Sequence, residues 1–234
     1  MLHEYIRQGL TLSALCYALG YAAGLTAFVL MARARGLATE GVMLLAGAGV
    51  IGGLVGAHIG QALAGGWEEA GGKSILGAIV GGWLTVTLVK RRIGLRRPTG
   101  DLFAVALCAG EAVGRWGCFF GGCCYGVPSG VPWAVWQHGA WRHPTQAYSS
   151  LAAFVILAVL WRYARGKPPE NALFYAQGLL MCAARFAIEF WRADHGVYVG
   201  LSAAQWACLA GMLFFGGRWL ALTRRVEAAH ACVS

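Results

Sequence analysis

Seven apolar stretches follow one another along this 234-residue chain. A membrane-spanning helix needs about 20 predominantly apolar residues, and most of these stretches reach that length. Hydrophobic residues make up 58% of the chain and charged residues only 12%, which excludes an ordinary soluble domain. We therefore expect an all-α, polytopic integral membrane protein that forms a single transmembrane domain over residues 1–234. The expected spans are residues 9–32, 41–64, 73–89, 101–121, 145–161, 171–190 and 201–222.

The positive charges predict the orientation of the chain. Thirteen of the 19 Lys and Arg residues lie on alternate connections between spans, and such basic loops stay in the cytoplasm. We therefore expect an outside N-terminus, a cytoplasmic C-terminus and residues 114–144 at the outer face of a bacterial plasma (inner) membrane. The net charge of +9 then reflects loops beside anionic lipid, so we expect no nucleic-acid partner. The thirteen are Arg33, Arg35, Lys90, Arg91, Arg92, Arg96, Arg97, Arg162, Arg165, Lys167, Arg218, Arg224 and Arg225.

The first span is expected to remain in the mature protein. It runs into two arginines without a small-residue cleavage site, unlike a secretory signal peptide. The glycines of the second span indicate close helix packing, the usual role of small residues at such spacings in membranes. They are Gly47, Gly49, Gly52, Gly53, Gly56 and Gly60.

One short segment, residues 114–126, gathers reactive side chains in this apolar chain. Arg115 carries a planar fork of donors that suits a phosphate or carboxylate. Cys118, Cys123 and Cys124 can act as nucleophiles, redox partners or soft metal ligands. The five glycines of the segment let a bound molecule approach the backbone closely.

Charged residues inside the expected spans are costly at bilayer depth, so they are paired or functional. Glu111 and Arg115 are spaced i,i+4, as are Arg185 and Glu189, and Arg192 follows one turn later. Each i,i+4 pair shares one helix face and can form an ion pair. These charges therefore either tie helices together or form a polar cavity in which the arginines hold a lipid phosphate and the glutamates fix their geometry.

The fifth span opens on a polar segment. His143 precedes Pro144, and proline is pre-organised for the first turn of a helix. Histidine side chains can exchange a proton near neutral pH, so His143 is a candidate acid or base, or only a capping group. The preceding loop, residues 118–144, contains tryptophans suited to the membrane interface, either as anchors or as a lid over substrate.

Six motifs, in order along the chain, resemble those of the bacterial prolipoprotein diacylglyceryl transferases. They are Tyr17 to Tyr21 with the basic exit Arg33 and Arg35; Gly71-Gly72-Lys73-Ser74; Gly114-Arg115-Trp116-Gly117 with Phe119 and Tyr125-Gly126; His143-Pro144-Thr145-Gln146 with Tyr148; Arg185 through Glu189 to Arg192; and Leu201-Ser202 with Gln205.

The resemblance implies a membrane enzyme of lipoprotein biosynthesis. It would move the diacylglyceryl group of phosphatidylglycerol onto the thiol of a preprolipoprotein cysteine, and it would need no cofactor and no metal ion. The residues implied in catalysis are Arg115, Arg185, Glu189 and His143, and their own thiol chemistry adds Cys118, Cys123 and Cys124 to the catalytic candidates. Those implied in substrate binding are Arg115, Arg185, Arg192, Glu111, Gly117, Gln146 and Tyr148.

Several positions depart from the family pattern. The histidine that the family places after its Gly-Gly-x-Ser motif is Leu76 here. The asparagine and glutamate of the arginine signature become Cys118 and Cys123. The general base is therefore open, and His143, Glu111 or a cysteine thiolate are the candidates. One of the three cysteines is also a candidate to accept the lipid group and pass it on.

A second class of function uses the cysteines alone. If they face an oxidising exterior, Cys118 can pair with Cys123 or Cys124 in a disulfide, which would make the chain a membrane thiol-redox protein or staple its loop. Alternatively, the three thiols bind a soft metal, with His143 or His138 as a further ligand.

Overall fold

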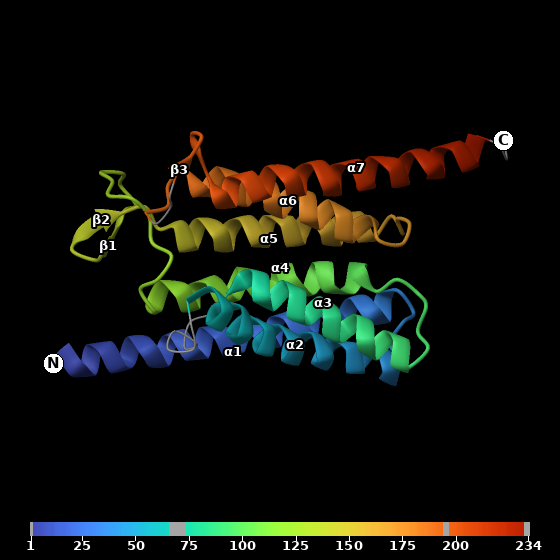
Figure 1. Ribbon diagram of the computed structural model, residues 1–234, viewed down its shortest axis with the longest axis horizontal. Helices are drawn as coiled ribbons and strands as arrows, with labels where there is room; N and C mark the ends of the chain where they lie inside the picture. The colour runs from blue at the N-terminus through green and yellow to red at the C-terminus, as the bar shows by residue number, and fades with distance from the viewer. Residues whose placement is uncertain (1, 66–73, 194–196, 232–234) are drawn as a thin grey trace. The chain divides into compact units, whose positions relative to one another are not determined.

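The computed structural model describes residues 2–65, 74–193 and 197–231, and its helices confirm the all-α, polytopic membrane fold (Figure 1). The helices are α1 (Leu2–Ala34), α2 (Glu40–Gly65), α3 (Ile75–Arg92), α4 (Gly100–Phe120), α5 (Thr145–Ala164), α6 (Ala172–Glu189) and α7 (Ala203–Ala231). The short strands are β1 (Val135–Gln137), β2 (Ala140–Arg142), β3 (Val197–Tyr198) and β4 (Leu201–Ser202).

Six of the described helices are long and apolar enough to cross a membrane. The exception is α3, which has 18 residues and ends in Lys90, Arg91 and Arg92. Its hydroxyl cap, Ser74, accepts a hydrogen bond from the amide of Gly77 at 3.2 Å, which fixes where the helix starts. A helix thus forms near the third expected span, and its passage through the membrane stays a prediction.

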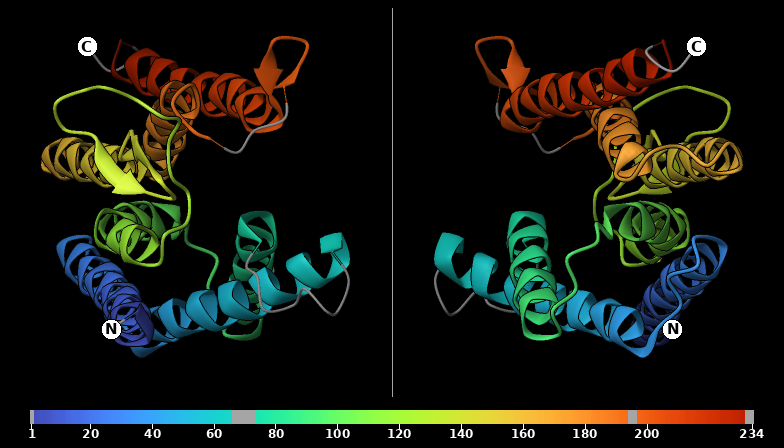
Figure 2. Two further views of the ribbon diagram at one scale, coloured as in Figure 1. Left: turned by 90° about the vertical axis from the view of Figure 1, so that its left-hand side faces the viewer. Right: turned by 90° about the vertical axis from the view of Figure 1, so that its right-hand side faces the viewer.

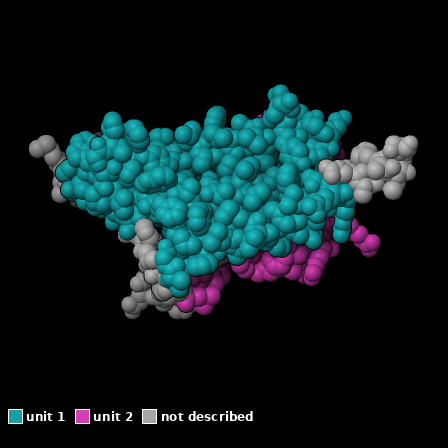
Figure 3. Space-filling model, turned by 90° about the horizontal axis from the view of Figure 1, so that it is seen from above, with its two compact units in different colours: residues 1–27, 99–234 teal, residues 28–98 magenta. Residues whose placement is uncertain are grey.

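The chain divides into two compact units, shown in different colours in Figure 3. Unit 2 comprises residues 28–98, and in it α2 packs closely along α3. A side chain at Gly56 would collide with the backbone of Gly77, and one at Gly60 would lie 2.8 Å from the Gly77 Cα atom. The close packing predicted for the glycines of the second span is therefore confirmed at Gly52, Gly56 and Gly60, whereas a side chain at Gly47 would meet open space.

Unit 1 comprises residues 1–27 and 99–234. In it α4 packs against α5 and α6, and α7 packs against α6, as the end-on views of Figure 2 show. The N-terminal part of α1 approaches α4 through glycines: a Cβ atom at Gly20 would lie 2.9 Å from the carbonyl oxygen of Gly110. The hairpin of β1 and β2 lies beyond the end of α4 and the start of α5 (Figure 1). Unit 1 holds every residue that the sequence analysis assigns to the site.

Candidate active site

Two ion pairs predicted from i,i+4 spacing form on the helices of unit 1. On α4, the Nε atom of Arg115 donates to the Oε1 atom of Glu111 at 2.8 Å. On α6, Arg185 lies 2.6 Å from the Oε2 atom of Glu189. Each glutamate thereby fixes the direction in which its arginine points.

Glu189 is the most deeply buried member of this charge cluster, with 3% of its surface exposed. Its Oε2 atom also lies 3.5 Å from the Nε atom of Arg192, and its Oε1 atom accepts a hydrogen bond from the hydroxyl of Ser202 at 3.2 Å. The Oε1 atom is thus hydrogen-bonded, whereas the buried Oε2 atom makes ion pairs with Arg185 and Arg192 but no hydrogen bond within the described part of the chain. Glu189 therefore joins the end of α6 to the start of α7.

The three arginines belong to one electrostatic cluster. Arg185 lies within interaction range of both Arg192 and Arg115. Three arginines face two glutamates, Glu111 and Glu189, so these five side chains carry one surplus positive charge. Such a cluster in a partly buried setting attracts an anion with several oxygen atoms, such as a phosphate.

The cysteines lie at the end of α4, where two glycines stop the helix. The amide of Gly122 donates to the carbonyl of Phe119 at 3.2 Å, and the amide of Cys123 donates to that of Cys118 at 3.1 Å. These two bonds, with Gly122 in the left-handed region at φ +66°, make a Schellman turn. The turn brings the residues at its two ends into contact, which places Cys123 beside Cys118.

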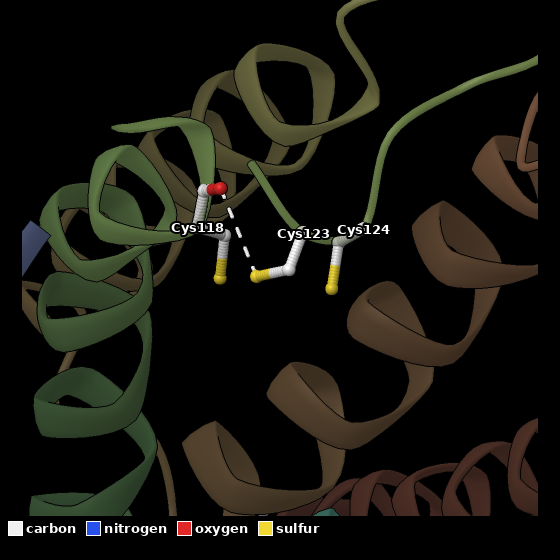
Figure 4. Close-up of side chains that lie close together, drawn as sticks. All are labelled: Cys118, Cys123 and Cys124. Atoms are coloured by element: carbon white, nitrogen blue, oxygen red, sulfur yellow. Dashed lines mark hydrogen bonds between the residues drawn. The ribbon is translucent and has the colours of Figure 1, made fainter. Parts of the chain in front are cut away.

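Cys124 brings a third thiol to the same place. Its φ of 60° is left-handed, which is uncommon for a residue other than glycine. The carbonyl of Cys124 accepts a hydrogen bond from the hydroxyl of Thr145 at 2.7 Å, and that of Cys123 accepts one from the amide of Gln146 at 2.8 Å. The start of α5 thus holds both carbonyls, and the three side chains extend toward the same space (Figure 4).

The thiols of this turn are not equivalent. Hydrogen bonds from the Cys118 and Cys123 thiols, together with the charge of Arg192, hold the pKa of Cys124 well below its usual range. The same thiol–thiol hydrogen bonds raise the pKa of Cys123. Cys124 therefore loses its proton more readily than Cys123, whose thiol donates to the carbonyl of Cys118 at 3.7 Å.

Backbone pairing joins the arginine signature to the end of α6. The amide of Val127 donates to the carbonyl of Trp191 at 2.9 Å, and the amide of Ala193 donates to that of Tyr125 at 3.2 Å. Between them, Gly126 pairs with Arg192. A side chain at Gly126 would lie 2.5 Å from the carbonyl oxygen of His143, so only glycine fits there. Motifs that are far apart in the sequence meet at this point.

His143 lies next to this pairing, and its ring is held by an aromatic group. Its Nδ1 atom lies 3.0 Å from the hydroxyl of Tyr148, which also accepts a hydrogen bond from the indole of Trp133 at 2.7 Å. Trp191 packs against the rings of both His143 and Tyr148. The position of the imidazole is thus set by α5 and by the loop that precedes it.

The loop before α5 contains a hairpin that the sequence analysis does not predict. His138 and Gly139 both have positive φ, at 48° and 74°, as a two-residue type I′ turn requires. Trp136 and Trp141 pair across the hairpin and are 61% and 58% exposed. The alternation of tryptophan with smaller residues around His-Gly is the sequence signal for this hairpin.

Two of the predicted substrate-binding residues make mainly structural contacts. Gly117 packs under the ring of Tyr17, and its carbonyl accepts a hydrogen bond from the hydroxyl of Ser13 at 2.7 Å. Gln146 is 2% exposed, and its amide supports the cysteine turn. Tyr17 also places its hydroxyl 3.3 Å from the Cys118 sulfur. Local sequence patterns do not assign Tyr17, Thr145 or Ser202 to the site. Each of these residues supports the site through a hydrogen bond to a residue distant in sequence.

Part of the predicted pattern lies outside what the structure describes. Gly71, Gly72 and Lys73 fall outside the described residues, as does the side chain of Leu76. Leu76 itself belongs to α3 in unit 2.

Comparison with known proteins identifies the family of this chain. The family model described as prolipoprotein diacylglyceryl transferase matches residues 7–221. The chain belongs to this family. The match spans both units and contains all the arginines, glutamates and cysteines of the candidate site, which confirms the resemblance seen in the motifs.

Three relatives from different bacteria are each named phosphatidylglycerol–prolipoprotein diacylglyceryl transferase. The protein of Gloeobacter violaceus is 38% identical over 70% of this chain and 65% of its own length. That of Finegoldia magna is 31% identical over 56% of this chain and 54% of its own. That of Streptomyces coelicolor, numbered 1, is 34% identical over 61% of this chain and 44% of its own. The chain thus covers less than two thirds of each relative.

Proposed function

We propose that this chain transfers the diacylglyceryl group of phosphatidylglycerol to the cysteine thiol of a prolipoprotein, or to a related thiol acceptor. The observation that carries the proposal is the cluster of Arg115, Arg185 and Arg192 around two glutamates in a member of the transferase family. The names of the relatives supply the donor and acceptor. No support comes from the comparisons for a thiol-redox or metal-binding protein in place of a transferase.

The chemistry of the proposed step explains why arginines are needed. The acceptor sulfur attacks the carbon of the diacylglyceryl group that is bonded to the phosphate oxygen. A carbon–sulfur bond therefore forms as this carbon–oxygen bond breaks. The leaving group is glycerol phosphate, and its negative charge grows as that bond breaks. Arg115 and Arg185, already oriented by their glutamates, would stabilise this charge in a water-poor site without further rearrangement.

The roles of the other charged residues follow from their contacts. Arg192 is bound both to Glu189 and, through a 3.5 Å contact, to the carbonyl of Cys124. It would therefore bind substrate while also holding the cysteine turn. Glu111 and Glu189 are engaged in ion pairs, so they orient the arginines rather than take a proton.

The acceptor thiol must lose its proton before it attacks. We assign this step to His143, because histidine is the side chain that most often acts as a general base. Tyr148 binds its Nδ1 atom and so fixes the ring. This assignment gives the chain a base although Leu76 replaces the histidine of the family pattern.

We place this site toward the outer face of a bacterial inner membrane, with the C-terminus in the cytoplasm. The support is the distribution of the basic residues over alternate connections. The exposed tryptophans of the β1–β2 hairpin also suit the level of the lipid headgroups. A reporter attached to the C-terminus should be active only on the cytoplasmic side.

Complementation tests the proposed activity in cells. The chain should restore growth and lipoprotein lipidation in bacteria depleted of their own transferase. Arg115→Ala and Arg185→Ala should each abolish rescue, whereas Arg162→Ala, at an exposed position near the end of α5, should not. Immunoblots of membrane fractions should show equal amounts of each variant. Full rescue by both site variants would contradict the proposal.

A further inference from the structure

The cysteine turn forms a compact group of soft donor atoms that the proposed diacylglyceryl transfer step does not use. The sulfur atoms of Cys118, Cys123 and Cys124 all lie within 4.8 Å of one another. Cys123 is exposed and the other two are partly buried, so one of the three thiols lies at the surface of the described structure. We propose that these three cysteines form a binding site for a soft, low-coordinate metal ion, with Cu(I) as the preferred ion.

The backbone pre-organises the three sulfurs. Cys118 and Cys123 are the two residues that a Schellman turn brings together, and the amide of Cys123 is bonded to the carbonyl of Cys118. Cys124 completes the group only because its backbone is left-handed, although adjacent side chains in an extended chain point apart. A strained conformation of this kind persists where its surroundings hold it, and here Thr145 and Gln146 do so.

The donor set selects the class of ion. Thiolates favour soft ions such as Cu(I), whereas carbonyls and carboxylates favour hard ones such as Mg²⁺. Among the described residues, neither a histidine nor a carboxylate joins the three sulfurs. His138 instead places its Nε2 atom 2.6 Å from the carbonyl oxygen of Gly122. Structural zinc sites almost always have four ligands, so a three-sulfur group suits Cu(I) better than Zn²⁺.

Positive charge next to the turn also favours this ion. Three thiolates with one Cu(I) ion carry two net negative charges, which are costly in a partly buried place. Arg192 contacts the carbonyl of Cys124 at 3.5 Å, and Arg115 lies within electrostatic range of Cys118 and Cys124. The one surplus positive charge of the arginine cluster offsets part of the charge of the complex.

Titration of the purified, full-length protein with Cu(I) in detergent tests this site, and the result does not depend on transferase activity. The reduced protein would compete anaerobically with a chromogenic Cu(I) chelator. Copper leaves the nitrogen atoms of the chelator and forms three bonds to sulfur, while thiol protons pass to the buffer, and no oxidation state changes. We expect one Cu(I) ion per chain and a sulfur-only shell of three ligands by X-ray absorption.

Two complementary variants locate the site. The chain has eight cysteines, and one variant keeps only Cys118, Cys123 and Cys124, while the other replaces these three with serine and keeps the other five. The first should bind copper like the natural chain. The second should bind copper more weakly by over ~100-fold. Mutating a residue that only supports a metal ligand costs up to about 100-fold in affinity, so removing the ligands should cost more. Equal binding by both variants, or a shell with nitrogen or with two sulfurs, would overturn the proposal.

If the triple variant does not fold, single substitutions can still test whether the three cysteines bind copper. Cys123→Ser changes only an exposed side chain, and Cys16→Ser on α1 is the matched control. Cys123→Ser should lose tight copper binding and the control should keep it. Tight binding by Cys123→Ser would also contradict a three-sulfur site.

Discussion

Glu189 and Arg185 form an ion pair one helical turn apart, with 2.6 Å between the Oε2 atom and the guanidinium nitrogen. The glutamate is almost fully buried at the end of α6, where it also meets Arg192 and Ser202. This carboxylate is therefore the point on which the geometry of two of the three arginines depends.

Replacing Glu189 should lower the free energy of unfolding of the protein. Glu189→Gln keeps the size of the side chain but leaves Arg185 and Arg192 without their counter-charge, and breaking a buried pair costs about 3 kcal/mol or more. Thermal unfolding in detergent, followed by tryptophan fluorescence, should show a clear fall in the apparent Tm. Glu170→Gln, at an exposed residue before α6, should change it little. Equal effects of the two substitutions would show that the pair does not stabilise the fold.

The turn after α4 should depend on Gly122. Its φ of +66° costs about 1–2 kcal/mol for any residue with a side chain, although there is room for one. Gly122→Ala should therefore lower stability by about that amount and disturb the contact between Cys118 and Cys123. Gly130→Ala is the control, because that glycine has open space and an ordinary φ. Thermal unfolding of the two variants side by side would separate the backbone effect from crowding.

The transfer reaction should need the shape of Arg115 as well as its charge. Arg115→Ala should lower kcat by roughly 100-fold or more, because it removes donors from the charge that develops on the phosphate. Arg115→Lys keeps the charge but cannot form a forked contact, so it should restore only part of the activity. Steady-state kinetics with labelled phosphatidylglycerol would measure both. A lysine variant as active as the natural chain would mean that charge alone suffices.

His143 should matter more than the residue that positions it. His143→Gln removes the proposed base and should lower kcat by about 100-fold. Tyr148→Phe removes only the hydroxyl beside Nδ1, so the loss should be smaller. The acceptor should be tested both as a thiol at neutral pH and at a higher pH where more of it is ionised. High pH should rescue His143→Gln in part, and a loss that is independent of pH would exclude the role as a base.

The sequence predicts the membrane helices and the ion pairs well, because both depend on local spacing. Apolar length locates α4 and α5 to within a few residues, and i,i+4 spacing predicts the pairs of Arg115 and Arg185. The third span is less clear, since Lys90 and the arginines after it extend the helix beyond its apolar part.

Local spacing does not predict contacts between segments that are distant in the sequence. The hydrogen bond from Ser202 to Glu189 and that from Thr145 to Cys124 each depend on how helices pack, which no local pattern encodes. The Schellman turn is different, because a Gly-Gly pair after an apolar helix is a sequence signal for it. Gly121 and Gly122 therefore predict the contact between Cys118 and Cys123.

The most direct test of the transferase proposal is to identify the product. The full chain, purified and placed in phosphatidylglycerol nanodiscs, would be incubated with a peptide that carries a lipobox cysteine. We expect mass spectrometry to show a diacylglyceryl group joined to the cysteine sulfur by a thioether, with one glycerol phosphate released per peptide. In the same time Arg115→Ala should form less product by roughly 100-fold or more, and Arg162→Ala should form as much as the natural chain. An unmodified peptide in the presence of correctly folded natural chain, or a thioester in place of the thioether, would contradict the proposed reaction.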